Sequence, residues 1–137
     1  MSIEKNKQVV RRWIDAGVNG GDLSVANELF EADVLAHAPE GDVRGVDEGP
    51  KASVEMLRGA FPDLHFAIED LIGEGDKVAA RFVAQGSHRG DFMGIAPTGR
   101  SVSFKGMYVY RLSAGRIAEV WVSLDALGLL GQLGATR

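Results

Sequence analysis

The spacing of apolar residues predicts helices in the first half of the chain. From residue 3 to residue 20, apolar side chains recur every three or four positions, with charged residues on the opposite side. This pattern predicts an amphipathic helix that packs against another part of the protein. Gly20-Gly21 ends that helix, and Asp22 is a suitable cap for a short second helix reaching Phe30. Asp47 is expected to cap a third helix, which Phe61 and the following proline bring to an end.

After this proline the apolar period changes from about 3.6 residues to 2, which is typical of strands with one covered face. Short turns between the segments favour antiparallel pairing of neighbours. Val34–Ala38 is a further short strand, and Asp125 is expected to cap a final helix. The predicted strands of the second half are Leu64–Ile72, Val78–His88, Val102–Leu112 and Ile117–Leu124.

Helices followed by a four-strand meander predict an α+β fold. We expect one domain over residues 1–137, built as a curved antiparallel sheet with the N-terminal helices packed over its concave face. A curved sheet covered in this way leaves a cone-shaped pocket, and such a pocket can hold one small molecule. A hydrophobic small molecule is therefore the expected partner.

Composition narrows the function classes. The chain has no cysteine, which excludes disulfide scaffolds, zinc sites built on thiolates and cysteine nucleophiles. Fifteen basic and nineteen acidic residues give a net charge of −4 without a basic cluster, so we expect no nucleic-acid partner. No segment is apolar for long enough to span a bilayer, and the N-terminus lacks the apolar stretch of a secretory signal. We therefore expect a cytoplasmic protein with no membrane partner.

Asp125 is the leading catalytic candidate. Trp121, Ser123 and Asp125 alternate along one strand, so their side chains are expected on one face, with the carboxylate near an indole. A carboxylate beside apolar walls exchanges protons near neutral pH, because burial disfavours its charged form. The alternative is that Asp125 only caps the last helix, and the two roles are compatible.

Two histidines are further candidates for acid–base chemistry. His88 ends its strand on a face of small or apolar side chains, and His37 follows a short apolar run. Each is either catalytic or a hydrogen-bonded core or rim residue, whereas His65 is expected to be solvated. The three histidines are 28 and 23 positions apart with no acidic ligand at a recognisable offset, so no metal site is expected.

Several aromatic and methionine side chains are candidates for an apolar lining of the pocket. Each of them, taken singly, is better explained as structural core, because packing alone accounts for such side chains on inward faces. Together they would suit a flat hydrophobic ligand. The candidate lining residues are Trp13, Phe30, Met56, Phe61, Phe92, Met107 and Trp121.

The second half of the chain contains two long motifs. They are His88-x-Gly90-x-Phe92-x-Gly94-Ile95-x-Pro97-Thr98-Gly99 and Trp121-x-x-x-Asp125-x-Leu127-Gly128-Leu129-Leu130-x-Gln132-Leu133-Gly134. Together with the shorter stretches Asn19-Gly20-Gly21-Asp22-Leu23 and Ala60-Phe61-Pro62-Asp63-Leu64, these motifs resemble the SnoaL-like polyketide cyclase family, and the resemblance extends over nearly the whole chain.

The resemblance implies a cone of the nuclear transport factor 2 type, a homodimer, and an enzyme that works without metal or organic cofactor. In the polyketide cyclases an aspartate that matches Asp125 is the acid/base of an intramolecular aldol ring closure. Carried over, Asp125 would take a proton from the carbon that becomes the nucleophile or deliver one to the aldol oxygen. His88 or His37 would stabilise negative charge on a carbonyl or relay the proton.

The sequence also departs from the family, which keeps other hypotheses open. Val120 stands where many relatives carry histidine, and Trp13 would narrow the cavity. One alternative is a module that binds a small molecule or dimerises without catalysis. Another is a proton-shuttling enzyme similar to ketosteroid isomerase, but Ala38 and Trp13 replace the carboxylate and tyrosine of those isomerases. An Asp-Arg-Asp cluster like that of an epoxide hydrolase could centre on Arg81 or Arg111.

Overall fold

The N-terminal amphipathic segment forms two consecutive helical elements in the computed structural model, which describes residues 2–134. Helix α1 spans Ile3–Arg12 and continues into η1, a π-helical segment over Trp13–Asn19. The indole of Trp13 lies against Gly17, where an added Cβ atom would come within 2.3 Å of the ring. The predicted helix is therefore confirmed in extent, and the missing side chain at Gly17 makes room for the tryptophan.

The next segment differs from its prediction at both boundaries, and the predicted cap is wrong because Ser24, not Asp22, occupies the cap position. Helix α2 spans only Val25–Leu29, and Phe30, which was predicted to end it, begins strand β1 over Phe30–Ala38. A short strand β2 over Gly41–Arg44 follows and pairs antiparallel with β1. Strand β2 was not predicted from the sequence, because three of its four residues are exposed and it lacks the apolar alternation of a half-buried strand.

The third predicted helix is confirmed as η2 over Asp47–Lys51 followed by α3 over Ala52–Ala60. The predicted cap is wrong. Val46 occupies the cap position, and the carboxylate of Asp47 instead forms an ion pair with Lys51 one turn later, at 3.2 Å.

The remaining strands form the predicted antiparallel meander. The six strands lie in the order β2-β1-β6-β5-β4-β3, and β1 runs parallel to β6, so the sheet is mixed and open. The last helix of the chain is the one predicted after Asp125. These elements are β3 (His65–Glu74), β4 (Lys77–Ser87), β5 (Ser101–Ser113), β6 (Arg116–Leu124) and α4 (Ala126–Gln132).

Strand β5 defines the two faces of the sheet. Its even-numbered residues, including Phe104, Tyr108 and Tyr110, are buried except for Gly106, whereas its odd-numbered residues, including Lys105 and Met107, are exposed or half-buried. We call the side of Tyr108 the inner face and the side of Met107 the outer face. Because cross-strand partners share a face, the register of β5 with its neighbours assigns a face to most residues of the sheet.

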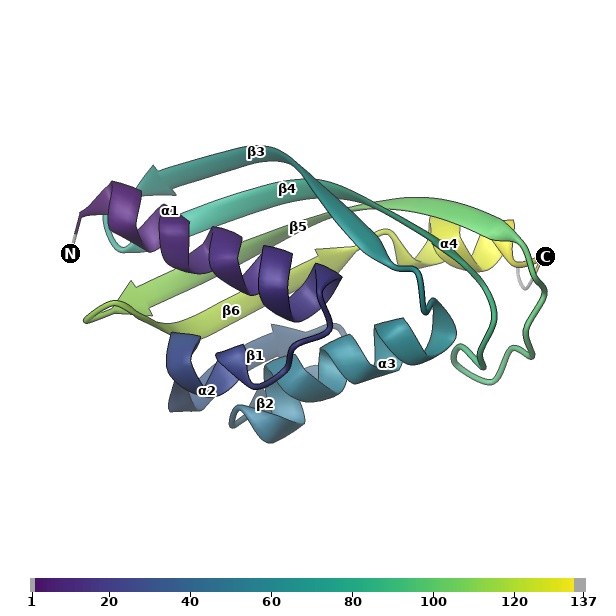
Figure 1. Ribbon diagram of the computed structural model, residues 1–137, viewed down its shortest axis with the longest axis horizontal. Coiled ribbons are helices and arrows are strands. Elements are labelled where there is room, and N and C mark those ends of the chain that lie inside the picture. The colour runs from purple at the N-terminus through teal and green to yellow at the C-terminus, as the bar shows by residue number, and fades with distance from the viewer. Residues whose placement is uncertain (1, 135–137) are drawn as a thin grey trace.

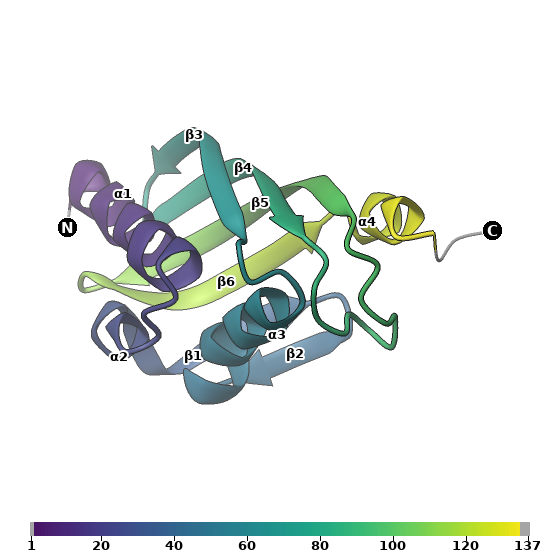
Figure 2. The ribbon, with the colours of Figure 1, turned by 45° about the vertical axis from the view of Figure 1, so that its right-hand side comes forward.

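Helices α1, α2 and α3 lie on one side of the sheet, and the sheet curves around them (Figure 1). Helix α4 lies at one end of β5 and β6 instead, near the long loop between β4 and β5 (Figure 2). The hydrophobic core fills the space between the helices and the inner face. Within the described residues, no helix is both long and apolar enough to cross a membrane.

Candidate functional site

Four of the expected lining residues are buried in the core on the inner side. Trp13 and Phe30 meet edge to face with ring centroids 4.9 Å apart, and Phe61 packs against Phe92 at 5.5 Å. All four are less than 5% exposed. Packing between aromatic rings accounts for these positions, and a role in binding substrate stays a prediction.

His88 directly follows β4, whose last residue is Ser87, and is completely buried. It lies on the inner side of the sheet, because it packs beside Phe61, which also contacts Phe104. Its Nδ1 accepts the backbone N–H of Thr98 at 3.1 Å, so the ring proton of the neutral imidazole is on Nε2. The Nε2 atom is buried without a hydrogen-bond partner in the described residues, and the ring packs beside Phe61 with centroids 5.6 Å apart. His88 is thus a hydrogen-bonded core residue, and it also keeps one N–H donor that no other described residue uses.

The motif that begins at His88 forms a loop, and backbone hydrogen bonds of His88 hold the two ends of this loop together. The backbone N–H of His88 donates to Arg100 at 2.9 Å, and Gly99 donates back to His88 at 2.8 Å. Gly90 packs so tightly on α3 that an added Cβ would lie 2.0 Å from the carbonyl oxygen of Gly59. The motif therefore specifies how residues 89–100 fold against α3.

Asp125 is exposed, so the expectation that apolar walls surround it is wrong. The strand ends at Leu124, and the chain turns into α4, where Oδ1 of Asp125 accepts the backbone N–H of Gly128 at 2.9 Å. The predicted capping role is confirmed. Oδ2 has no protein partner among the described residues, and an added Cβ on Gly128 would lie 2.3 Å from it.

His37 lies on the outer face. The expectation that its side chain belongs to the pocket is therefore also wrong. It pairs in register with Trp121, which pairs with Val109, a residue of the outer face. The imidazole lies between two carboxylates, with Nδ1 2.9 Å from Asp42 and Nε2 2.5 Å from Glu119. Its ring stacks on Trp121 at 5.2 Å.

Glu119 also accepts a hydrogen bond from Nε of Arg111 at 3.0 Å, which completes a charged network on this face. The hydrogen bonds that His37 makes to Glu119 and then to Asp42 raise the pKa of His37 above its usual value. The same contact with His37, followed by the one with Arg111, lowers the pKa of Glu119. We call Asp42, His37, Glu119 and Arg111 the outer network.

The outer face holds two further residues that were expected in the lining. Trp121 belongs to it by register, and Met107 is opposite Arg81 and 46% exposed. Met56, on α3, is 50% exposed. Arg81 pairs with Asp70 on this face as well, so neither Arg81 nor Arg111 centres a cluster near Asp125.

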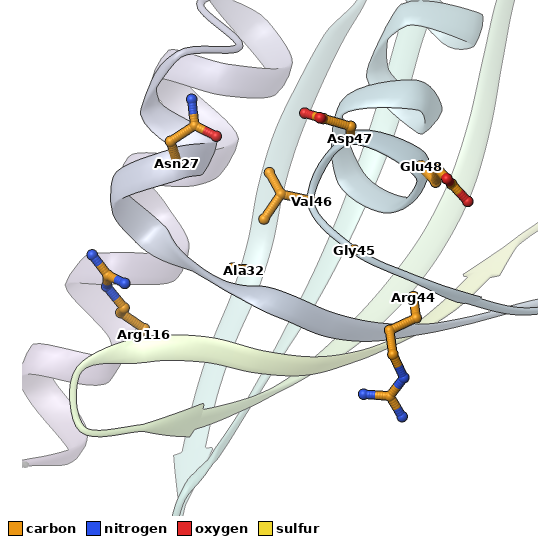
Figure 3. A pocket seen from close by; sticks show the side chains of 8 residues that line it. All are labelled: Asn27, Ala32, Arg44, Gly45, Val46, Asp47, Glu48 and Arg116. Atoms are coloured by element: carbon orange, nitrogen blue, oxygen red, sulfur yellow. The ribbon is translucent and has the colours of Figure 1, made fainter.

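Two open depressions lie on the surface. The first, of about 480 Å³, lies between β2, the start of η2 and the start of β6 (Figure 3). Arg44 and Arg116 border it together with the carboxylates of Asp47 and Glu48, so its rim carries both charge signs. The second, of about 520 Å³, is lined by polar side chains of β3, β4, β5 and α4. Neither contains the inner-face residues described above.

Sequence reasoning missed Tyr108, a buried inner-face residue of β5. Its hydroxyl is buried without a hydrogen-bond partner in the described part of the chain. The alternation Phe104, Tyr108, Tyr110 along β5 is the signal that could have placed it on the inner face.

Comparisons with known proteins agree with this architecture. A curated relative, the aklanonic acid methyl ester cyclase of Streptomyces peucetius, is 31% identical over 131 residues, covering 92% of this chain and 88% of the relative. A protein from Streptomyces galilaeus proposed to be a hydroxylase is 29% identical, with a TM-score of 0.88 and coverage of 99% and 85%.

The fold is also that of a proposed SnoaL-like polyketide cyclase from a Jannaschia species, with a TM-score of 0.91, 24% identity and coverage of 100% and 97%. The hydroxylase and cyclase names on similar structures illustrate that this fold alone does not specify a reaction. The model of the SnoaL-like polyketide cyclase family matches residues 8–133. The chain belongs to the SnoaL-like polyketide cyclase family.

Proposed function

We propose that this protein is an enzyme that closes a ring in a hydrophobic polyketide-like compound by an intramolecular aldol reaction. The observation that carries the proposal is the match, over 92% of the chain, to an aklanonic acid methyl ester cyclase. The proposed reaction joins a carbon next to one carbonyl group to the carbon of another, and it needs a group that accepts and returns a proton.

Asp125 is the proposed proton acceptor. One of its oxygens is fixed by the cap of α4, and the other is free to meet a substrate. Two half-buried apolar residues of the inner face, Val122 and Leu124, lead along β6 to this carboxylate. A hydrophobic substrate that covers them would bring its reacting carbon to the end of the strand.

His88 is the proposed partner of Asp125 in the reaction. Its Nε2–H is an unused donor at the same end of the inner face, and a carbonyl oxygen that gains negative charge is a suitable acceptor. His37 has no part in this proposal, because both of its ring nitrogens are engaged on the outer face.

The experiment follows conversion of aklanonic acid methyl ester by chromatography and mass spectrometry. Ring closure gives a product of unchanged mass and changed retention. Asp125→Asn keeps an oxygen that can cap α4 but removes the base, so we expect a folded protein with activity reduced by about 10²-fold or more. Gly128→Ala tests the position of the carboxylate, because the added methyl group displaces it.

Wild-type activity in Asp125→Asn would remove Asp125 from the mechanism. Binding of the ester without conversion by the wild-type protein would instead support the non-catalytic module. The homodimer implied by the family remains a prediction, which light scattering of the purified protein checks.

A further inference from the structure

Tyr108 has a polar atom that the folded chain leaves without a partner. The residue is 7% exposed, and its hydroxyl oxygen is buried with no hydrogen bond in the described residues. Buried polar atoms almost always have a partner, because losing hydration without replacement is unfavourable. A buried, unpaired hydroxyl on the covered face of the sheet therefore needs an explanation.

The surroundings of Tyr108 are aromatic. Phe82 meets its ring edge to face with centroids 5.1 Å apart, and Phe66 does so at 6.2 Å. Phenylalanine offers no strong acceptor, so the hydroxyl keeps its hydrogen available. Burial raises the pKa of Tyr108 well above its usual value, which keeps the side chain neutral and a donor throughout the physiological range.

Tyr108 also lies on the strand next to the one that leads to the proposed reaction site. Its cross-strand partner is Val122, one of the two half-buried residues that lead to Asp125. The other, Leu124, meets Phe82 over Gly106, where an added Cβ would lie 2.8 Å from Leu124 and 2.5 Å from Phe82. Leu124 thus lies over Gly106 together with Phe82, one of the rings that pack against Tyr108, and a substrate passing from Asp125 to Tyr108 would have to displace it.

We propose that the hydroxyl of Tyr108 donates a hydrogen bond to a carbonyl oxygen of the polyketide-like substrate and stabilises the negative charge that forms there. This inference rests on the proposed function. Asp125 takes a proton from the carbon next to one carbonyl, and that carbon bonds to the carbon of the second carbonyl. The electron pair of the second C=O bond moves to its oxygen, which Tyr108 holds. This oxygen then receives the proton from Asp125, so substrate and product have the same atoms.

The test compares Tyr108→Phe with Tyr110→Phe, the same change two residues along the same strand and face. For each variant, binding of aklanonic acid methyl ester is titrated, turnover is measured, and the melting temperature without ligand is recorded. For Tyr108→Phe we expect about tenfold weaker binding and about 10²-fold lower kcat. We expect an unchanged or higher melting temperature, because the variant removes an unpaired buried hydroxyl. Tyr110→Phe should stay within about twofold of wild type in binding and kcat.

Wild-type affinity and kcat in Tyr108→Phe would overturn the inference, as would a clearly lower melting temperature, which would show that the hydroxyl is paired within the protein. If wild type binds the ester without converting it, the proposed function fails, and the affinity ratio alone decides the role of Tyr108. If wild type does not bind the ester, this inference is overturned.

Discussion

The two faces of the sheet differ in whether their polar side chains have hydrogen-bond partners. On the outer face, His37 and Glu119 are each hydrogen-bonded to two partners within the outer network. On the inner face, the hydroxyl of Tyr108 and Nε2 of His88 are buried and have no partner in the described chain. The outer network is the larger cluster of titratable groups, yet the fold itself accounts for every contact in it.

This difference separates two kinds of evidence for a site. A cluster of paired charges at a partly exposed surface is explained by mutual stabilisation. An unpaired donor in an apolar interior has no such explanation, and a ligand oxygen supplies one. The inner face is therefore the better candidate for chemistry, although it has fewer charged groups.

The largest expected effect compares an aromatic residue on each face. Phe82 is 1% exposed and stacks on Phe66 with centroids 4.1 Å apart, so Phe82→Ala leaves a cavity in the core. We expect a loss of about 3–5 kcal/mol in the free energy of unfolding, measured with urea. Trp121→Ala on the outer face removes a half-buried ring and should lose about 1–2 kcal/mol. Equal losses would show that the outer face is as much a core as the inner face.

The second prediction concerns Nδ1 of His88, the ring nitrogen that accepts a hydrogen bond from Thr98. His88→Leu removes the acceptor for the N–H of Thr98, and we expect a loss of about 1–3 kcal/mol in the free energy of unfolding. Trypsin should then cleave after Arg89 faster than in wild type, because the loop is no longer closed. His88→Asn, whose side-chain oxygen can replace Nδ1, is the control and should restore slow cleavage. Equally fast cleavage in both variants would mean that Nδ1 does not hold the loop.

The sequence predicts most of the fold because its periodicity is strong. The change from a 3.6-residue to a 2-residue period separates the helices from the meander, and it places each of the four meander strands. It does not predict β2, which is nearly all exposed, or the parallel pairing of β1 with β6. That pairing joins segments about eighty residues apart, and the pattern of apolar residues within each segment carries no information about its distant partner.

The site is less predictable, and Trp121 shows the reason. Alternation correctly places Trp121 and Ser123 on one face, but both parities of β6 carry apolar residues, so the pattern does not say which face is covered. Burial of Val120 and its register with Tyr110 settle the question. The same ambiguity assigned His37 and Met107 to the interior. The cap at Asp125 was predicted correctly, but the same local signal was wrong at Asp47, where Val46 occupies the cap position.

The smallest expected effect is a pH dependence confined to the outer network. Because the pKa of His37 is raised in the folded state, its charged form stabilises the protein fully below the usual pKa of 6.5, and this contribution is lost as pH rises through the higher folded value. Because the pKa of Glu119 is lowered, its contribution is present above 4.5 and is lost as pH falls through the lower folded value. Both contributions are therefore present together between 4.5 and 6.5.

The measurement is the free energy of unfolding of wild type and His37→Gln across this range. Their difference should be largest at about pH 5.5 and should shrink towards about pH 9 and about pH 3. In a Glu119→Gln background the maximum should flatten, because the main partner of His37 is gone. A difference that does not vary with pH would show that the imidazole is held by packing on Trp121 rather than by charge. Charge pairing would then no longer distinguish the outer face from the inner face.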